Sequence, residues 1–173
     1  MIKTKALSLL LILNCFGISS IASIPKVSNL DSIKTFLSEG SFRGGKFGSG
    51  FSLVGVKRVF SPNGNAERLI LEMGDKDGKL YSGKTGYFHA QLFRNPSELS
   101  LDLPQLMKSK VNNTHLKNLI KQSKLIQMAD LSLDPEDHST HLKMRFKTPI
   151  KMRVFTLSPK KSTPKLVIDI TKI

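Results

Sequence analysis

The sequence contains no tryptophan and only one cysteine, Cys15, in 173 residues. Because Cys15 lies in a segment that we expect to be removed, the mature chain would have no disulfide and no catalytic thiol. Acidic residues are scarce as well: 13 Asp and Glu stand against 27 Lys and Arg, a formal charge of +14. This excess favours an anionic partner. The length suits one domain and argues against an enzyme with a large cofactor lobe.

Long hydrophobic runs are absent too, because the longest apolar stretch, residues 6–18, is too short to span a membrane. Two lysines precede this stretch, and the small residues Ser20 and Ala22 follow it at the −3 and −1 positions of a cleavage site. That order is typical of a secretory signal peptide. We therefore expect residues 1–22 to be cleaved, which lowers the charge from +14 to +12, and the mature chain to reach the periplasm without a transmembrane segment.

Two alternatives to cleavage remain open. The same segment could form a buried N-terminal helix, or Cys15 could carry a lipid anchor. Lipid anchoring fits less well, because Asn14 stands before the cysteine where a small residue is usual.

Residues 23–50 are predicted to hold a short helix and a glycine-rich linker. Apolar residues at helical spacing predict the helix over residues 24–37. Residues 38–50 contain five glycines, which predicts no regular element there. These glycines lack the spacing of a phosphate-binding loop, and export argues against a nucleic-acid partner.

From Phe51 onward apolar and polar residues alternate, and this period of two predicts β-strands separated by turns such as residues 61–65. One helix interrupts them, with an apolar stripe in residues 116–120 after the potential capping residues 112–114. We expect strands at residues 51–60, 68–73, 87–93, 99–103, 125–133, 141–146, 150–157 and 165–170.

Two groups of strands resemble each other. Residues 95–103 and 163–170 both place Leu-x-(Leu/Ile)-Asp-(Leu/Ile) after a proline, and residues 68–71 and 141–144 take comparable earlier places. The pattern indicates a twofold repeat; the alternative is coincidence between two strands that follow prolines. The predicted fold class is therefore all-β: a β-sandwich of two related sheets over residues 51–173. Each half buries its apolar face on the other, and one short helix lies between the halves.

No cofactor, metal or catalytic constellation is expected. His138 and His141 enter a strand, where residues three apart face opposite sides, so they are not predicted to share a metal. The segment with Asp75 and Asp77 has the start of a calcium-binding loop but lacks the bidentate acid that ends one, so it is not predicted to bind calcium. Nothing in the sequence favours a Ser-His-Asp trio.

Basic residues are most regular in two strands near the C-terminus. Lys143 and Arg145 alternate with apolar residues in one strand, as do Lys151 and Arg153 in the next. Residues 148–149 are short enough for a hairpin, so we expect both strands to present these side chains on one solvent-exposed face. That face either keeps the protein soluble or binds carboxylates, phosphates or sugar acids through its arginines. It could be extended by Lys57, Arg58, Lys160, Lys161 and Lys165.

Three segments carry short strand motifs that include an arginine or an aspartate: AERLILE at 66–72, NPSELSLDL at 95–103 and PKLVIDI at 164–170. In these motifs the chain, over about residues 53–173, resembles the amidase N-terminal (AMIN) domain of bacterial envelope proteins such as cell-wall amidases and pilus secretins. The resemblance implies a periplasmic β-sandwich that binds peptidoglycan and localises attached machinery. Glu98 and Lys165 depart from the arginine that usually follows the proline.

We therefore expect an exported, non-enzymatic module that binds an anionic envelope polymer, above all peptidoglycan. Charge-assisted hydrogen bonds to stem-peptide carboxylates, with Tyr81 or Tyr87 stacking on sugar faces, would hold the polymer. The alternative is a protein-interaction subunit of a secretion or pilus assembly. A third hypothesis is a small hydrolase using Asp102, Asp169 or His141, although acids at strand ends more often contact turns or arginines. The candidate ligand-binding residues are Arg68, Lys143, Arg145, Lys151, Arg153 and Tyr87.

Overall fold

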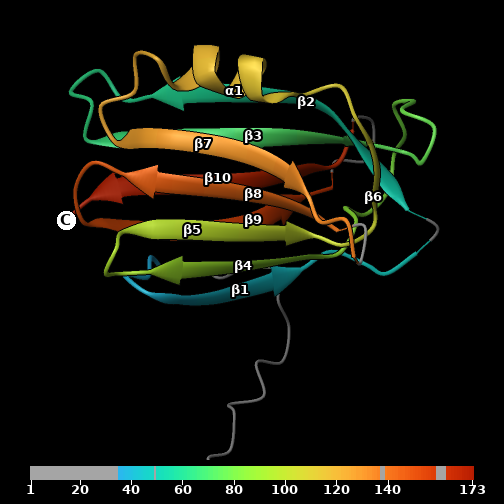
Figure 1. Ribbon diagram of the computed structural model, residues 1–173, viewed down its shortest axis with the longest axis horizontal. Coiled ribbons are helices and arrows are strands. Elements are labelled where there is room, and N and C mark those ends of the chain that lie inside the picture. The colour runs from blue at the N-terminus through green and yellow to red at the C-terminus, as the bar shows by residue number, and fades with distance from the viewer. Residues whose placement is uncertain (1–34, 49, 137–138, 159–162) are drawn as a thin grey trace, which may run out of the picture.

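The computed structural model describes residues 35–48, 50–136, 139–158 and 163–173. Within them the chain is mainly β: two five-stranded sheets pack together, with one short helix (Figure 1). In this described part of the chain, no helix is long and apolar enough to cross a membrane. Outside it lie the expected signal peptide with Cys15, most of the helix expected over residues 24–37, and His138.

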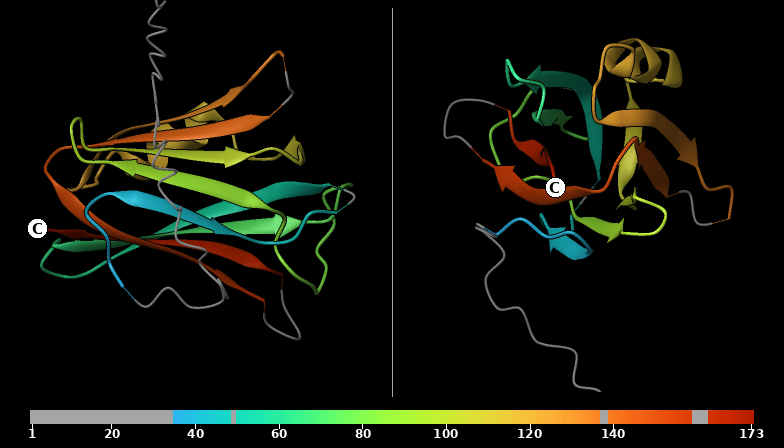
Figure 2. Two further views of the ribbon diagram at one scale, coloured as in Figure 1. Left: turned by 90° about the horizontal axis from the view of Figure 1, so that it is seen from below. Right: turned by 90° about the vertical axis from the view of Figure 1, so that its left-hand side faces the viewer.

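Ten strands form the two sheets, which Figure 2 shows as two layers. The first sheet has the order β1-β4-β5-β8-β7 and the second the order β6-β2-β3-β10-β9. Neighbouring strands are antiparallel except for the parallel pair β2 and β6. The strands are β1 (Gly40–Gly44), β2 (Phe51–Phe60), β3 (Ala66–Gly74), β4 (Phe88–Phe93), β5 (Glu98–Leu103), β6 (Leu106–Ser109), β7 (Ile126–Leu133), β8 (Thr140–Phe146), β9 (Ile150–Leu157) and β10 (Lys165–Lys172).

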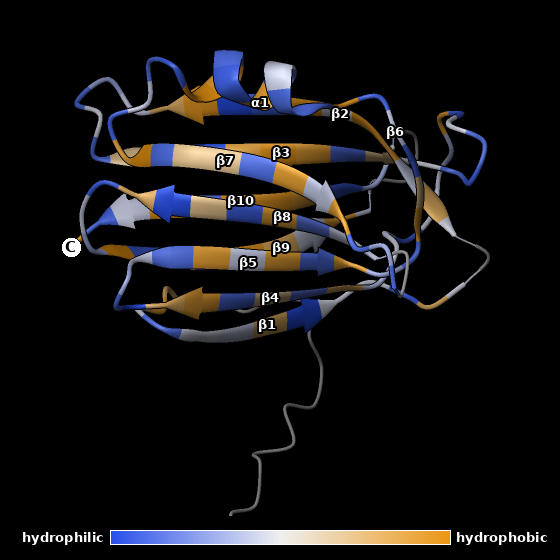
Figure 3. Cartoon of the chain, in the orientation of Figure 1, coloured by the Kyte–Doolittle hydropathy of each residue, from blue (hydrophilic) through white to orange (hydrophobic). Residues whose placement is uncertain are grey.

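Alternating side chains build the core between the sheets. In β5 the side chains of Leu99, Leu101 and Leu103 are fully buried, while the residues between them face outward. In β10 the side chains of Leu166, Ile168 and Ile170 join the same core. Figure 3 shows the resulting alternation of apolar and polar residues along the strands. Burying one such side chain contributes about 1.5–3 kcal/mol, so the shared core is the main source of stability.

The predicted repeat is visible in the topology. The first half forms the hairpins β2-β3 and β4-β5, and the second half forms β7-β8 and β9-β10. In this repeat β2, β3, β4 and β5 correspond to β7, β8, β9 and β10. Replacing each strand of the order β2-β3-β10-β9 by its counterpart gives β7-β8-β5-β4, which is the first sheet without its edge strand β1. The two sheets are therefore related by a pseudo-twofold exchange. Each half contributes one hairpin to each sheet, so the halves interlock.

The hairpin predicted at residues 148–149 is wrong. β8 lies in the first sheet and β9 in the second, so residues 147–149 cross from one sheet to the other. An alternating pattern has the same form whether two strands pair side by side or pack face to face across a core. The outward side chains of β8 and β9 consequently point to opposite sides of the molecule.

The glycine-rich segment also departs from the prediction, because it contains the edge strand β1, paired with β4. Phe42 is buried and anchors β1 to the core. Gly40 and Gly45 bracket the strand with φ angles of +132° and +77°, which only glycine adopts readily. Nor do the last residues of the expected helix 24–37 form one, since Leu37 pairs its backbone with Met152 in β9.

Helix α1 (Asn113–Ile120) lies along one side of the two sheets and contacts β7 and β2 (Figure 1). Asn112 caps it by accepting a hydrogen bond from the backbone N–H of His115. The Asn113 side chain bonds both the N–H and the C=O of Leu131 on the edge strand β7. An edge strand with free backbone groups invites pairing with other chains, and at Leu131 this amide occupies them.

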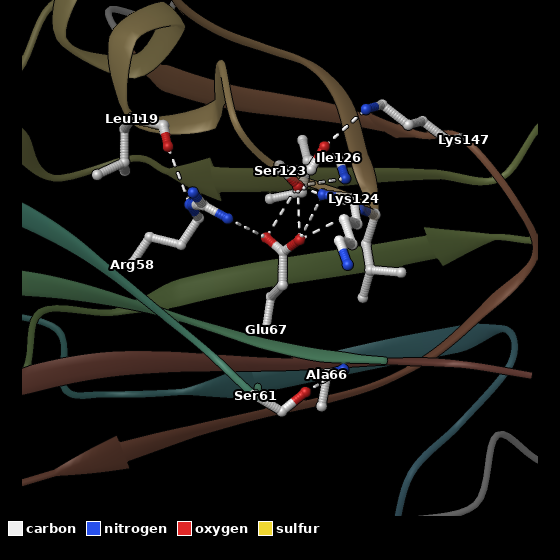
Figure 4. A network of polar contacts seen from close by, with 10 residues as sticks. Arg58, Ser61, Ala66, Glu67, Leu119, Ser123, Lys124, Ile126 and Lys147 are labelled. Atoms are coloured by element: carbon white, nitrogen blue, oxygen red, sulfur yellow. Dashed lines mark hydrogen bonds and ion pairs between the residues drawn. The ribbon is translucent and has the colours of Figure 1, made fainter. Parts of the chain in front are cut away.

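A buried charged pair joins α1 to the second sheet (Figure 4). The Glu67 carboxylate accepts hydrogen bonds from the Ser123 hydroxyl, from the backbone N–H of Lys124 and from Arg58 Nη1. Arg58 Nε donates to the carbonyl of Leu119 in the helix. The side chains of Arg58 and Glu67 are only 7% and 1% exposed. The Arg58 side chain therefore holds elements of the fold together. The expectation that Arg58, like its neighbour Lys57, would extend the basic surface is wrong.

Candidate ligand-binding face

The outer face of the second sheet carries a row of two arginines around one aspartate. Arg68 in β3 and Arg153 in β9 flank Asp169 in β10, each directly across the strand pair. Arg68 grips the carboxylate with two hydrogen bonds, from Nε to Oδ1 at 2.5 Å and from Nη2 to Oδ2 at 2.9 Å, and Arg153 Nη2 donates to Oδ2. Two of the predicted site residues therefore meet, although they share an internal partner.

The electrostatics of this row favour ionised side chains. Burial opposes the charge on Asp169, but the hydrogen bonds and charges of Arg68 and Arg153 outweigh it, so the pKa of Asp169 is lowered. The hydrogen bond to Asp169 raises the pKa of Arg68. Two cations on one anion leave the row with one unit of positive charge, and the Arg68 side chain remains 45% exposed.

Aromatic rings surround the row. Arg153 lies 5.0 Å from the ring centres of both Phe36 and Phe155, within the range of cation–π attraction. Beside Arg68 the surface is hollowed by a cavity of about 330 Å³, whose walls include Phe36, Phe60 and Arg68. The arrangement combines exposed guanidinium groups with apolar walls, and this suits a ligand that has both carboxylates and flat sugar faces.

The whole outer face of the second sheet is positively charged. On the four strands β2, β3, β10 and β9, five basic side chains face outward against the two carboxylates of Glu72 and Asp169, for a net charge of +3. Glu72 pairs with Lys57 at 2.8 Å and lies 4.0 Å from Lys165. The five basic residues are Lys57, Arg68, Lys151, Arg153 and Lys165. Three of them, Arg68, Lys151 and Arg153, are predicted site residues.

Lys143 and Arg145 lie on the opposite side of the molecule, on the outer face of the first sheet. Arg145 faces Glu98 across the strand pair, with 3.3 Å between Nη2 and Oε2. Lys143 stands in register with Asp130 of β7. The prediction that β8 and β9 share one basic face is therefore wrong, and β8 contributes to a face on which acids balance its cations.

The pseudo-twofold exchange places a second row at the equivalent position of the first sheet. Asp102, the counterpart of Asp169, is flanked by His141 of β8 and His89 of β4. His141 Nδ1 lies 2.7 Å, and His89 Nδ1 3.2 Å, from the Asp102 carboxylate. The sequence repeat had already paired Asp102 with Asp169 and residue 141 with residue 68. Aligning the preceding strands in the same way would have found His89.

Ser139 gives this second row the connectivity of a Ser-His-Asp triad, since its Oγ lies 2.7 Å from His141 Nε2. A nucleophilic serine must reach a substrate carbonyl, yet Ser139 is only 2% exposed. Ser139 therefore does not present an accessible nucleophile. In the described part of the chain, no group of three or more His, Cys, Asp or Glu is placed to hold a metal ion.

Tyr87 lies away from both rows, at one end of the sandwich. Its ring stacks on Phe47 with 4.1 Å between the ring centres, so Phe47 covers one face of Tyr87. Tyr81 lies in the preceding loop, and its hydroxyl donates a hydrogen bond to the carbonyl of Lys84. Lys160 and Lys161, which were also expected to extend the basic face, lie outside the described residues.

Neither a protein-family model nor a curated protein matches the chain. The resemblance to the AMIN domain rests on the strand motifs alone.

Proposed function

We propose that the protein is an exported, non-enzymatic module that binds an anionic polymer of the cell envelope, above all peptidoglycan, on the outer face of its second sheet. The observation that carries the proposal is the net charge of +3 on this face, centred on Arg68 and Arg153 beside a hollow with aromatic walls. A localised positive surface charge of this kind attracts polyanions over distances of about 10 Å at moderate salt.

The polymer's carboxylates would contact the arginine row. Arg68 uses Nε and Nη2 for Asp169, which leaves its Nη1 group for a ligand, and Lys151 is exposed at the margin of the sheet. Sugar rings would lie against the aromatic side chains of Phe36 and Phe60 in the hollow. Such contacts are weak singly and become effective when many sites on one polymer are available. The AMIN resemblance adds a periplasmic location and peptidoglycan as the expected polymer.

Co-sedimentation with purified sacculi tests this proposal. We expect the double variant Lys57→Gln/Lys151→Gln, which removes two charges from the face and leaves the Asp169 row intact, to lower retention at least about fivefold. The matched control is Lys117→Gln/Lys143→Gln, which removes the same charge from α1 and from the first sheet. We expect the control to be retained like the wild type. Equal losses in both variants would indicate unspecific charge attraction, and absence of wild-type retention would reject the function.

One observation favours the alternative, a protein-interaction subunit of a secretion or pilus assembly. The same outer face has exposed apolar side chains: Val59 and Leu157 are 54% and 44% exposed. Exposed apolar residues mark a protein contact where they gather into a contiguous patch. Cross-linking in cells from position 59 or 157 distinguishes the two: a discrete protein adduct without sacculus retention would establish the alternative.

A further inference from the structure

A second hollow, of about 550 Å³, opens at the end of the sandwich where the segment after β1 meets the loop before β4. Its volume is typical of small-molecule sites, which measure roughly 300–1,000 Å³. Its walls combine three aromatic rings with three lysines: Phe47, Phe51, Tyr81, Lys46, Lys76 and Lys84. None of the five basic residues on the outer face of the second sheet lines it.

The glycine-rich segment builds one wall of this hollow in a fixed position. The Lys46 N–H donates to the carbonyl of Thr85 at 2.9 Å. A Cβ atom on Gly45 would lie 1.9 Å from the carbonyl oxygen of Gly86, so only glycine permits this approach. The Gln105 side chain then holds Gly48 by donating to its carbonyl and accepting from its N–H, at 2.9 and 3.2 Å. A wall formed before binding reduces the entropy that a ligand must overcome.

The charges around the hollow favour an anion. Lys46, Lys76 and Lys84 make no ion pair with any residue that the structure describes. Two aspartates also line the hollow, but the Asp75 carboxylate already accepts the backbone N–H groups of Asp77 and Lys79 at 3.0 and 2.8 Å. The lysines therefore outnumber the acids, and one acid is occupied by its own turn.

Thr85 supplies an unsatisfied polar group in the same wall. It lines this hollow and a neighbouring one of about 430 Å³, and Lys46 and Lys84 line both as well. Thr85 is 2% exposed, and its hydroxyl has no hydrogen-bond partner in the described part of the chain. Buried hydroxyls are nearly always bonded, and an exception beside a cavity is typical of a site for a ligand or ordered water.

We propose that this hollow binds a small anionic carbohydrate, a sugar acid or a sugar phosphate, with the anion between Lys46 and Lys84 and the sugar ring against Phe47 and Tyr81. Stacking on Tyr87 fixes Phe47, and the hydrogen bond from Tyr81 to Lys84 fixes the loop that carries that lysine. Sugar rings pack well on such aromatic surfaces, and ammonium groups bind carboxylates and phosphates by charge-assisted hydrogen bonds. The site is separate from the polymer-binding face.

Titration of the full chain, followed by backbone NMR shifts, tests the site with four probes: glucose 6-phosphate, glucuronate, glucose and inorganic phosphate. We expect one of the two anionic sugars to bind at least about tenfold more tightly than glucose or phosphate, with shifts at residues 45–48 and 84–86. Phosphate binding as tightly as glucose 6-phosphate would refute the role of the aromatic wall. Absence of binding by both anionic sugars at millimolar concentration would refute the site.

Two double variants separate this site from the proposed function. Lys46→Gln/Lys84→Gln should weaken binding of the anionic sugar at least about tenfold and leave sacculus retention unchanged. Lys57→Gln/Lys151→Gln should do the reverse. Unchanged sugar binding in Lys46→Gln/Lys84→Gln would overturn the proposal whatever the sacculus result, whereas loss of sacculus binding alone concerns only the polymer-binding face.

Discussion

The buried pair of Arg58 and Glu67 gives the sharpest test of how the fold is held together. Replacing Glu67 by alanine removes an acceptor that serves Arg58, the Ser123 hydroxyl and two backbone N–H groups. Leu125 N–H retains the Ser123 oxygen as an acceptor, and Lys124 is exposed to water. The main cost is therefore the Arg58 guanidinium, which keeps one carbonyl partner but loses its buried counter-charge.

Breaking one partner of such a pair costs about 3–5 kcal/mol, a large part of the roughly 5–15 kcal/mol that stabilises a typical domain. We expect Glu67→Ala to lower the free energy of unfolding in urea by that amount. Glu72→Ala, on the same strand, removes a carboxylate whose partner Lys57 is 65% exposed, and should cost less than about 1 kcal/mol. Equal losses in the two variants would refute the reasoning.

A compensating change checks the same point from the other side. Arg58→Met combined with Glu67→Leu removes both charges together, so no uncompensated charge stays buried. We expect this double variant to be more stable than Glu67→Ala in the same urea assay. If it is instead the less stable of the two, the cost of Glu67→Ala does not arise from the stranded guanidinium.

Three further predictions follow from other contacts. Because the pKa of Asp169 is lowered in the folded state, the contribution of Asp169 to stability is present above about pH 4 and is lost as the pH falls through its folded pKa. The difference in unfolding free energy between wild type and Asp169→Asn, measured in urea, should therefore vanish below about pH 4. A difference that stays constant with pH would contradict this. Thr85→Val should raise the unfolding free energy by up to about 1 kcal/mol, since it removes an unsatisfied buried hydroxyl; a measured loss would show that the hydroxyl is bonded. Asn113→Ala should increase self-association by exposing backbone groups of Leu131, measured by light scattering, whereas Asn112→Ala should cost about 1 kcal/mol without association.

Local pattern was enough to place most elements. Every expected strand is present with its limits within two residues, and β2 and β9 match the expected ranges in full. Helix α1 begins after Asn112, one of the three expected caps. β6 escaped prediction because only Leu106 of its four residues is buried, so no alternation marks it. β1 was not predicted because its glycines interrupt the alternating pattern, although the buried Phe42 anchors the strand to the core.

The pairing of strands, and with it the candidate site, was beyond local pattern. Arg68 and Asp169 are 101 residues apart in the sequence, and only the sheet order brings them together. The assumption that β8 and β9 form a hairpin placed Arg145 beside Arg153, whereas the sheets separate them. The internal repeat was the one long-range signal, and it located the equivalent aspartates at positions 102 and 169 before any pairing was known.

The interlocked halves have a consequence for how this protein can be taken apart. β3 pairs with β10 and β5 pairs with β8, so each half closes an edge of the other in both sheets. Separated near α1, either half would expose two unpaired edges and an uncovered apolar face. These exposed edges and this apolar face would be covered best by a second copy of the same half, bound in the symmetric manner of a twofold dimer. The single chain thus has the architecture of a small homodimer whose two subunits have been joined end to end.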